Sequence, residues 1–197
     1  MTICFVHIPK TGGRTVDVAL GKVPGYRRLG HGSRSAGWQH ASQILDELEQ
    51  PFSFTVVRNP WERLLSAWTF LRMPGRNEGD QRDAERFVWP YESFREFVHE
   101  GIGGGSCWAQ AIHLRPQYWW VCRPDGTVCV DRVGRTAQLR RFLREICQER
   151  GLPPVTVGHK NRSRHAGAGW RDSYDAEMRQ VVLEAYALDF ELFGPWC

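Results

Sequence analysis

The sequence predicts an α/β fold in which a central parallel β-sheet is flanked by helices. Two short apolar runs, at 3–8 and 52–57, have the length and composition of buried strands. Each is followed by a polar loop and then by a helical pattern, at 14–20 and 61–70. Strands that alternate with helices in this way are typical of a parallel sheet. A chain of 197 residues favours one domain, 1–197.

The composition is that of a globular protein. It is 42% hydrophobic and 24% charged and holds nine tryptophans, whereas disordered chains are poor in hydrophobic and aromatic residues. The formal net charge of +4 is too small to indicate a nucleic-acid partner, and we expect none. Arginines cluster, for example at 132–144, and the guanidinium group suits phosphate, sulfate or carboxylate.

The sequence shows no apolar stretch of the roughly 20 residues that a membrane span needs, and the run at 3–8 is too short for a signal peptide. We therefore expect a cytoplasmic protein with no membrane segment. The six cysteines form no CxxC pair, which argues against a zinc site. Cys122 and Cys129 flank a turn signal and could face each other, as a disulfide in an oxidising compartment or as two thiols in the cytosol.

The remaining elements are less regular. The expected helices are at 42–48, 136–150 and 173–188, and a capping box at 93–96 indicates another helix start. Short strands are expected at 118–122 and 127–131. Loops or weakly ordered segments are expected at 21–39, 72–90 and 151–169, which are rich in Gly, Pro or Arg.

The first motif is a strand, then the loop Pro9-Lys10-Thr11-Gly12-Gly13, then a helix. Glycines let the backbone approach an anion, and a helix N-terminus offers N–H groups and partial positive charge. Lys10 adds a full charge, and Thr11 and Thr15 add hydroxyl groups. The loop is not a Walker A loop, in which the Lys follows the second Gly and a hydroxyl side chain binds Mg²⁺. Kinase or NTPase chemistry is therefore disfavoured, and we expect no metal.

The second motif is another strand, loop and helix. Arg58 stands at the strand end, beside Asn59-Pro60, which is a helix start with Asn as N-cap and Pro at the first helical position. A phosphate at that point would meet both the Arg fork and the helix N-terminus. Ser66 lies about two turns into the same helix.

Together the two motifs, Val6 to Gly13 and Val57 to Ser66, closely resemble those of sulfotransferases that use 3′-phosphoadenosine 5′-phosphosulfate (PAPS). The resemblance is greatest to the group of heparan sulfate 2-O- and related carbohydrate sulfotransferases, with their bacterial relatives. It implies the P-loop-like sulfotransferase fold. The first motif resembles the family's 5′-phosphosulfate loop and the second its 3′-phosphate site. Fainter similarities extend over 116–118, 130–135, 159–163 and 186–194.

The resemblance implies a role for each matching residue. Lys10 would contact the phosphosulfate and steady charge as the sulfuryl group departs. The 3′-phosphate would be bound by Arg58 and Ser66, with Lys160 in a loop near that end of the nucleotide. The residues expected to hold the 5′-phosphate are Thr11, Gly12, Gly13, Arg14 and Thr15. Two positions depart from the family pattern: relatives commonly have Thr or Ser where this chain has Arg14, and often an acidic residue near Thr136.

The acceptor hydroxyl needs a base as it attacks sulfur, and His, with an ordinary pKa of about 6.5, suits that task. His40 lies shortly before the second strand, where relatives carry a catalytic or substrate-facing His, and it is the first candidate. His31 is the second, and a carboxylate or another His stays open. His7, within a strand, is expected to pack. Four tryptophans are expected in the core or stacked on adenine or sugar: Trp61, Trp68, Trp119 and Trp120.

The sequence thus predicts an enzyme that transfers a sulfuryl group from PAPS to a hydroxyl of an acceptor, which the resemblance favours to be a carbohydrate. The product of the donor would be 3′-phosphoadenosine 5′-phosphate. The alternatives are a nucleotide-dependent phosphotransferase or hydrolase, and a non-catalytic binder of sulfated glycan or nucleic acid. The acceptor and the oligomeric state are left open by the sequence.

Overall fold

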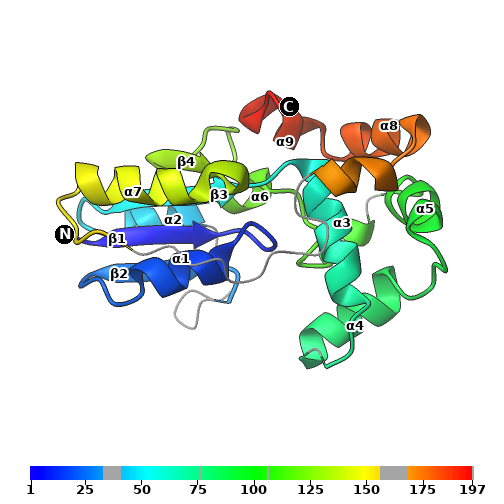
Figure 1. Cartoon of the computed structure of the whole chain (residues 1–197), viewed down its shortest axis with the longest axis horizontal. Helices are drawn as coiled ribbons and strands as arrows, with labels where there is room; N and C mark the ends of the chain where they lie inside the picture. Colours follow the sequence, from blue (N-terminus) through cyan, green and yellow to red (C-terminus); the bar gives the residue numbers. More distant parts are fainter. Residues whose placement is uncertain (33–40, 76, 106, 156–167, 197) are drawn as a thin grey trace. The chain divides into compact units, whose positions relative to one another are not determined.

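A computed structural model (Figure 1) describes residues 1–32, 41–75, 77–105, 107–155 and 168–196. The chain divides into two compact units, the first comprising Met1–Arg58 and Gln117–Asn161 and the second Asn59–Pro116 and Arg162–Cys197. The chain leaves the first unit after Arg58 and returns to it at Gln117. The single domain that chain length favours stays a prediction.

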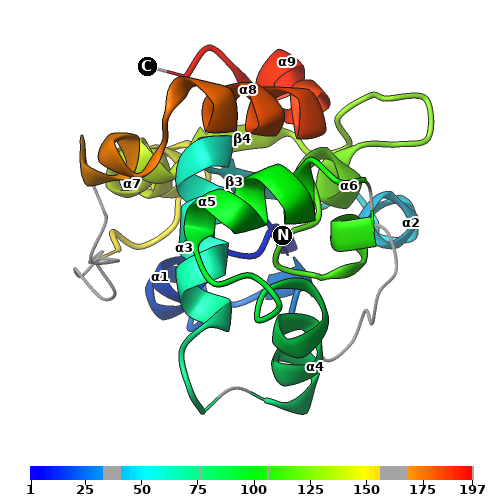
Figure 2. The same ribbon diagram turned by 90° about the vertical axis from the view of Figure 1, so that its right-hand side faces the viewer.

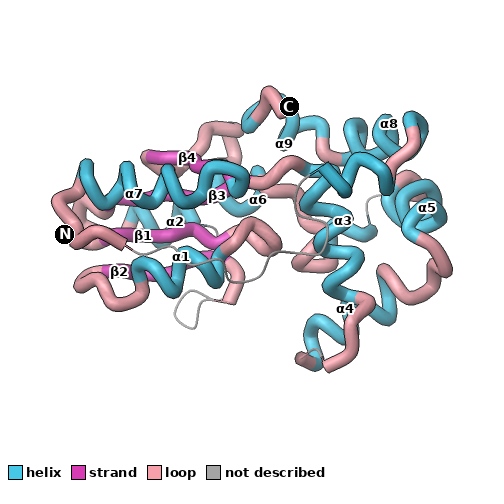
Figure 3. Tube along the Cα trace, viewed as in Figure 1, coloured by secondary structure: helices cyan, strands magenta, loops and turns pink. Residues whose placement is uncertain are grey.

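A parallel four-stranded sheet with the order β2-β1-β3-β4 forms the centre of the first unit. Figure 3 shows its strands as the magenta segments. The predicted α/β fold with a central parallel sheet is confirmed. Every residue of β1 and β3 is buried, because both strands are internal to the sheet. The strands are β1 (Ile3–His7), β2 (Tyr26–Gly30), β3 (Phe52–Val57) and β4 (Arg132–Arg135).

Helices cover both faces of this sheet. From β1 the chain moves to β2 on one side, then returns past β1 to β3 on the other. Because parallel crossovers are right-handed, this reversal places α1 (Gly13–Leu20) and α2 (Ala41–Asp46) on opposite faces (Figure 1). The helix α7 (Leu139–Glu149) packs beside α1, and α6 (Tyr118–Val121) contacts α2.

The core of the first unit lies between the sheet and the pair α1 and α7. Alternate residues of β1 and β3 point to this face, and the rings of Phe5 and Phe54 stack with centroids 5.2 Å apart. Leu20 of α1 and Phe142 of α7 complete the same cluster. Gly134 of β4 lies directly under Phe142: a Cβ atom there would come within 2.2 Å of the ring.

The second unit is helical in its described part. The chain enters it through α3 (Pro60–Leu71) and α4 (Glu78–Phe87), and α5 (Phe94–Glu96) runs directly into a π-helix, Phe97–Ile102. The π-helix packs on α8 (Figure 2). The remaining elements are the 3-10 turns Cys107–Gln110 and Ala168–Ser173 and the helices α8 (Ala176–Ala185) and α9 (Ala187–Phe193).

Aromatic rings and one buried arginine hold the second unit together. Trp68 of α3 stacks on Phe97 of the π-helix, with ring centroids 4.8 Å apart. Arg63 of α3 is 1% exposed, and its guanidinium donates to the carbonyl oxygens of His113 and Arg115, at 3.3 and 2.8 Å. Because a buried cation needs acceptors, these two carbonyls fix the segment before Pro116 against α3.

Several expected elements agree with the structure. The strand expected at 52–57 is β3, and Asn59 caps α3 as expected, its side chain accepting a hydrogen bond from the Trp61 N–H. The capping residue Ser93 also begins a helix. The helix expected at 136–150 opens with a 3-10 turn, Thr136–Gln138, before α7, and that expected at 173–188 is divided at Tyr186 into α8 and α9.

Four expectations about secondary structure are wrong. The segment 21–39 contains the edge strand β2, whose polar Tyr-Arg-Arg sequence hides the strand pattern. The segment 72–90 contains α4, whose hydrophobic face is short. Instead of the strand expected at 118–122, Tyr118–Val121 forms α6. The segment 127–131 forms no strand: an isolated antiparallel bridge joins Cys122 to Val128, and β4 begins at Arg132. Most of 151–169 lies outside the described residues.

The cysteines in the described part of the chain are free thiols, including Cys122 and Cys129. Burial raises the pKa of the Cys4 thiol to about 11 and also raises that of Cys129. Among the described helices, none is long and apolar enough to cross a membrane.

Substitution of Gly134 by Ala tests the packing of β4 against α7. The added methyl group meets Phe142 at a distance that requires a shift of the ring or the strand. We expect the free energy of unfolding to fall by about 1–3 kcal/mol in urea denaturation. Gly169→Ala is the matched control, because that position has open space, and it should change stability by less than about 0.5 kcal/mol. Equal stability of the two variants would contradict this packing.

Candidate active site

The carboxyl ends of β1 and β3 lie side by side in the first unit. The two strands pair in parallel, with Val6 opposite Thr55, so the loops that follow them emerge at the same edge of the sheet. The strand order reverses between them, since β2 lies beyond β1 and β4 beyond β3. In open α/β sheets a reversal of this kind is the usual place for a ligand.

The loop after β1 has the backbone of an anion site. Lys10 and Gly12 both have positive φ, at 69° and 91°, which turns the chain sharply before α1. The buried hydroxyl of Thr11 donates to the carbonyl of Ile8 at 2.8 Å and so braces the turn. The helix α1 has no side-chain N-cap and no acidic residue in its first turn. Its first N–H groups, which have no partner within the helix, therefore suit a bound anion.

Gly13 is required by its neighbour His7. A Cβ atom at position 13 would lie 2.0 Å from His7 Nε2, so any side chain there would displace the imidazole. His7 is buried at the end of β1, as expected from the sequence. The second glycine of the motif thus lets α1 begin directly against the His7 ring.

Arg58, the residue after β3, connects the two loops. Its side chain is buried, and its Nη1 donates to the carbonyl oxygen of Lys10 at 3.1 Å. The structure therefore brings Lys10 and Arg58 together, as their positions at neighbouring strand ends require. A guanidinium carries five N–H donors in a fixed fork, which suits both backbone carbonyls and anionic groups.

Thr136, the first residue after β4, lies close to both the loop after β1 and the end of β3. Its hydroxyl lies 3.1 Å from the carbonyl of Val57 and 3.4 Å from that of Thr11. A hydroxyl has one proton, so it donates to one of these carbonyls at a time, and the shorter contact is the better hydrogen bond. Where relatives often carry an acidic residue, this chain therefore has an uncharged hydroxyl donor within reach of two backbone carbonyls.

A polar cluster lies beside the loop, between α1 and the ends of β1 and β2. Arg28 donates to the carbonyl of His31 through Nε at 3.0 Å and Nη2 at 2.8 Å, and its Nη1 pairs with Asp17 of α1. His7 Nδ1 lies 2.9 Å from the same carbonyl and 2.5 Å from Arg28 Nη2. A ring nitrogen cannot donate to the first and accept from the second at once, so its proton decides between them.

Tyr26 completes this cluster by donating from its hydroxyl to Asp17 at 2.8 Å. Burial, with the nearby Asp17 carboxylate, raises the Tyr26 pKa far above its ordinary value, so the phenol stays protonated and keeps donating. The cluster fixes the backbone of His31, and the His31 ring lies 5.2 Å from that of His7.

A model of the sulfotransferase family matches residues 2–194, almost the whole chain. The chain belongs to the sulfotransferase family. It is therefore a transferase whose family chemistry is sulfuryl transfer. No curated protein matches it.

The other predicted site residues of this sulfotransferase lie partly within and partly outside the described residues. His40 and Lys160 lie outside the described residues. Ser66 is half-buried on α3, which belongs to the second unit. Arg14 is exposed at the start of α1, and the N–H of Thr15 already donates to the carbonyl of Gly12 at 2.9 Å. Their roles toward a nucleotide stay predictions.

The N-terminus of α3 is less suited to an anion than the sequence indicated. Asn59 accepts the Trp61 N–H at 3.0 Å, Pro60 has no N–H, and Glu62 adds negative charge to the first turn. These features weaken the expected contribution of the helix N-terminus, and the joint grip of a phosphate by Arg58 and the helix stays a prediction.

Three of the four highlighted tryptophans of the sulfotransferase have protein neighbours in the core. Trp61 stacks on Trp170 with rings 9° from parallel, and Trp68 is buried against Phe97. Trp120 is 9% exposed beside Gly30. Trp119 is 42% exposed, so it is the one of the four with a large accessible face.

Two residues at this edge of the sulfotransferase sheet had no role in the sequence analysis. Gln117, fully buried, contacts the backbone of Arg58, and Arg135 ends β4 beside β3, opposite Val57. The general rule that ligands gather at the carboxyl ends of parallel strands would have selected Arg135 had β4 been recognised. Gln117 lies in 116–118, a segment with a fainter resemblance to the family, but that resemblance implied no role for this residue.

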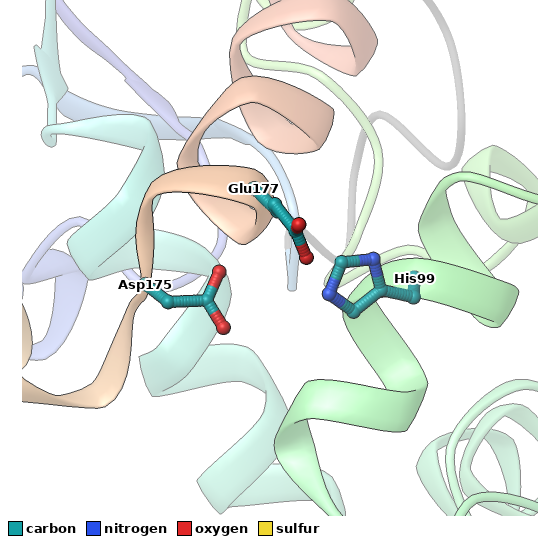
Figure 4. Close-up of side chains that lie close together, drawn as sticks. All are labelled: His99, Asp175 and Glu177. Carbon is teal, nitrogen blue, oxygen red and sulfur yellow. The ribbon is translucent and has the colours of Figure 1, made fainter.

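A second group of ionisable side chains lies in the second unit (Figure 4). Ligand atoms of His99, Asp175 and Glu177 lie within 4.8 Å of one another, and among the described residues His99 Nε2 has no hydrogen-bond partner. However, Arg95 forms ion pairs with both carboxylates, with Glu177 at 3.2 Å. A metal ion would have to displace this guanidinium, so the group is better described as an Arg-centred ion cluster.

We therefore expect Mg²⁺ and Ca²⁺ to leave the melting temperature of the wild type unchanged. In Arg95→Ala the two carboxylates lose their cation, and Ca²⁺, which prefers oxygen ligands, should then raise the melting temperature. Differential scanning fluorimetry with and without each ion measures the melting temperatures of the wild type and of Arg95→Ala. Arg141→Ala, at an exposed position on α7, is the control. Stabilisation of the wild type by either ion would contradict the description of the cluster.

Proposed function

We propose that this sulfotransferase uses PAPS as donor and transfers its sulfuryl group to a hydroxyl of a carbohydrate acceptor. The observation that carries the proposal is the direct hydrogen bond between Arg58 and the Lys10 carbonyl. It joins two basic residues, each placed after one of two adjacent parallel strands. A nucleotide with anionic groups at both the 5′ and the 3′ position is the ligand that such a pair of sites suits best.

The 5′ end would be held by the loop after β1. The uncapped N-terminus of α1 and the tight turn at Lys10 and Gly12 support this assignment, because a helix start without a capping side chain suits an anion. Thr11, Gly13, Arg14 and Thr15 would contribute as the family resemblance implies. The ammonium group of Lys10 would stabilise negative charge on the leaving oxygen as its bond to sulfur breaks.

The 3′ end would be held by Arg58, with Ser66 and Lys160 as further contacts. The guanidinium fork suits a phosphate group, and burial of Arg58 increases the strength of a charge-assisted hydrogen bond. This assignment would make the enzyme select nucleotides that carry a 3′-phosphate over those that do not.

The acceptor side requires a base. The acceptor oxygen forms a bond to sulfur while its proton passes to a neutral imidazole, for which His40 is the first candidate and His31 the second. No step in this scheme needs a metal ion. The choice of a carbohydrate rests on the resemblance to the carbohydrate sulfotransferases alone, and turnover assays with glycans, tyrosine peptides and small alcohols would test it.

Substitution of Arg58 by Ala tests the 3′-phosphate site. We expect affinity for 3′-phosphoadenosine 5′-phosphate to weaken by about 1–3 kcal/mol in isothermal titration calorimetry, because a charge-assisted contact is lost. Affinity for AMP, which has no 3′-phosphate, should fall less. Arg141→Ala is the control. Unchanged selectivity between the two nucleotides in Arg58→Ala would remove Arg58 from the site.

Substitution of His40 by Ala tests the base. Turnover with PAPS should be lost while affinity for 3′-phosphoadenosine 5′-phosphate stays near that of the wild type, because the base acts on the acceptor. His31→Ala, measured in parallel, separates the two candidates. If His40→Ala retains turnover and His31→Ala abolishes it, the base is His31.

The same binding assay separates this function from its alternatives. A sulfotransferase should bind 3′-phosphoadenosine 5′-phosphate without Mg²⁺ and should not prefer ATP with Mg²⁺. A phosphotransferase would show the opposite preference, and a non-catalytic binder would show no turnover with any acceptor.

A further inference from the structure

Gln117 holds the main chain of Arg58 at two points. The Arg58 N–H donates to Gln117 Oε1 at 2.8 Å, and Gln117 Nε2 donates to the Arg58 carbonyl at 2.9 Å. The side chain of Gln117 is fully buried. A primary amide offers a donor and an acceptor side by side without a charge, so it pairs with a peptide unit as a neighbouring strand would.

The pairing is needed because Arg58 lies just beyond the sheet. The ladder between β3 and β4 ends at Val57, opposite Arg135, and that between β3 and β1 ends at Thr55. A buried peptide group without a partner costs free energy, so the Gln117 amide continues the pairing for one residue. Gln117 directly precedes α6 and makes no side-chain cap there.

The Arg58 side chain in turn binds the main chain of Lys10. The Arg58 guanidinium donates to the Lys10 carbonyl, and Lys10 has a positive φ, a conformation that a residue with a side chain adopts only when its surroundings impose it. Gln117 thus fixes the Arg58 backbone, and the Arg58 side chain fixes the Lys10 peptide. The chain also leaves the first unit at Arg58 and re-enters it at Gln117, so the amide joins these two points.

We propose that Gln117 is a positioning residue that sets the separation between the 5′-phosphosulfate and 3′-phosphate subsites, and so determines selectivity for 3′-phosphorylated nucleotides. The proposal rests on the proposed function, since it assumes that Lys10 and Arg58 bind opposite ends of one nucleotide. Gln117 itself touches neither end. If the role of Gln117 were purely structural, its replacement would lower the stability of the protein and weaken the binding of all nucleotides equally.

The test compares binding of two nucleotides by the wild type, Gln117→Met and Gln148→Met. Met is close to Gln in size and carries no amide, and Gln148, exposed on α7, is the matched control. Dissociation constants for 3′-phosphoadenosine 5′-phosphate and for AMP are measured by calorimetry, with the melting temperature of each variant. We expect the preference for the 3′-phosphorylated nucleotide to fall about tenfold in Gln117→Met, the equivalent of one charge-assisted contact, and to stay unchanged in Gln148→Met.

A second variant, Gln117→Glu, covers the case in which Gln117→Met does not fold. The introduced carboxyl group, when protonated, again offers a donor and an acceptor to Arg58, whereas the carboxylate offers only acceptors. Selectivity should therefore be low at high pH and recover as the pH falls through the pKa of that carboxyl, with the wild type measured at the same pH values. A structural role alone would not produce this pH dependence of the ratio.

The outcomes separate the two proposals. If the wild type binds 3′-phosphoadenosine 5′-phosphate no better than AMP, the proposed function fails. If the wild type has the preference, and Gln117→Met or Gln117→Glu at high pH keeps it, the role of Gln117 is overturned while the proposed function stands.

Discussion

The site of this sulfotransferase depends on the parallel pairing of β1 and β3, because it is this pairing that brings Lys10 and Arg58 to one edge of the sheet. The hydrogen bond from Arg58 to the Lys10 carbonyl then converts proximity into a fixed arrangement. Each supporting contact serves the same pair. The Thr136 hydroxyl donates to the carbonyl of Val57 at the end of β3, and Gly13 lets α1 start against His7.

The two helices that follow these strands differ in how their N-termini are satisfied. α1 begins with two glycines and no capping side chain, so its amide groups are directed at the loop. α3 begins with Asn59 and Pro60 and carries Glu62 in its first turn. The same strand, loop and helix pattern thus leaves backbone donors and Lys10 at the first strand end, and Arg58 beside a capped helix at the second.

The sequence predicted those parts of the fold and site that rest on local patterns. β3 is a continuous apolar run, and Asn59-Pro60 marks the start of α3, so both were found. β2 was missed because an edge strand can be polar: Arg28 points to Asp17 and to the His31 carbonyl, partners that only the fold supplies. Gln117 lies in the family-like segment 116–118, but its role was not predicted, since its partner lies 59 positions away along the chain. The positions of His40 and Lys160 lie outside the described residues.

The amide bridge between Arg58 and Gln117 has a further consequence for how such a chain can vary. The hydrogen bonds between Arg58 and Gln117 hold together the two ends of the segment 59–116. The entropy of closing a loop grows only with the logarithm of its length, about 0.6 kcal/mol for each doubling. Changes in the length of the segment 59–116 would therefore cost the sheet of the first unit little conformational entropy.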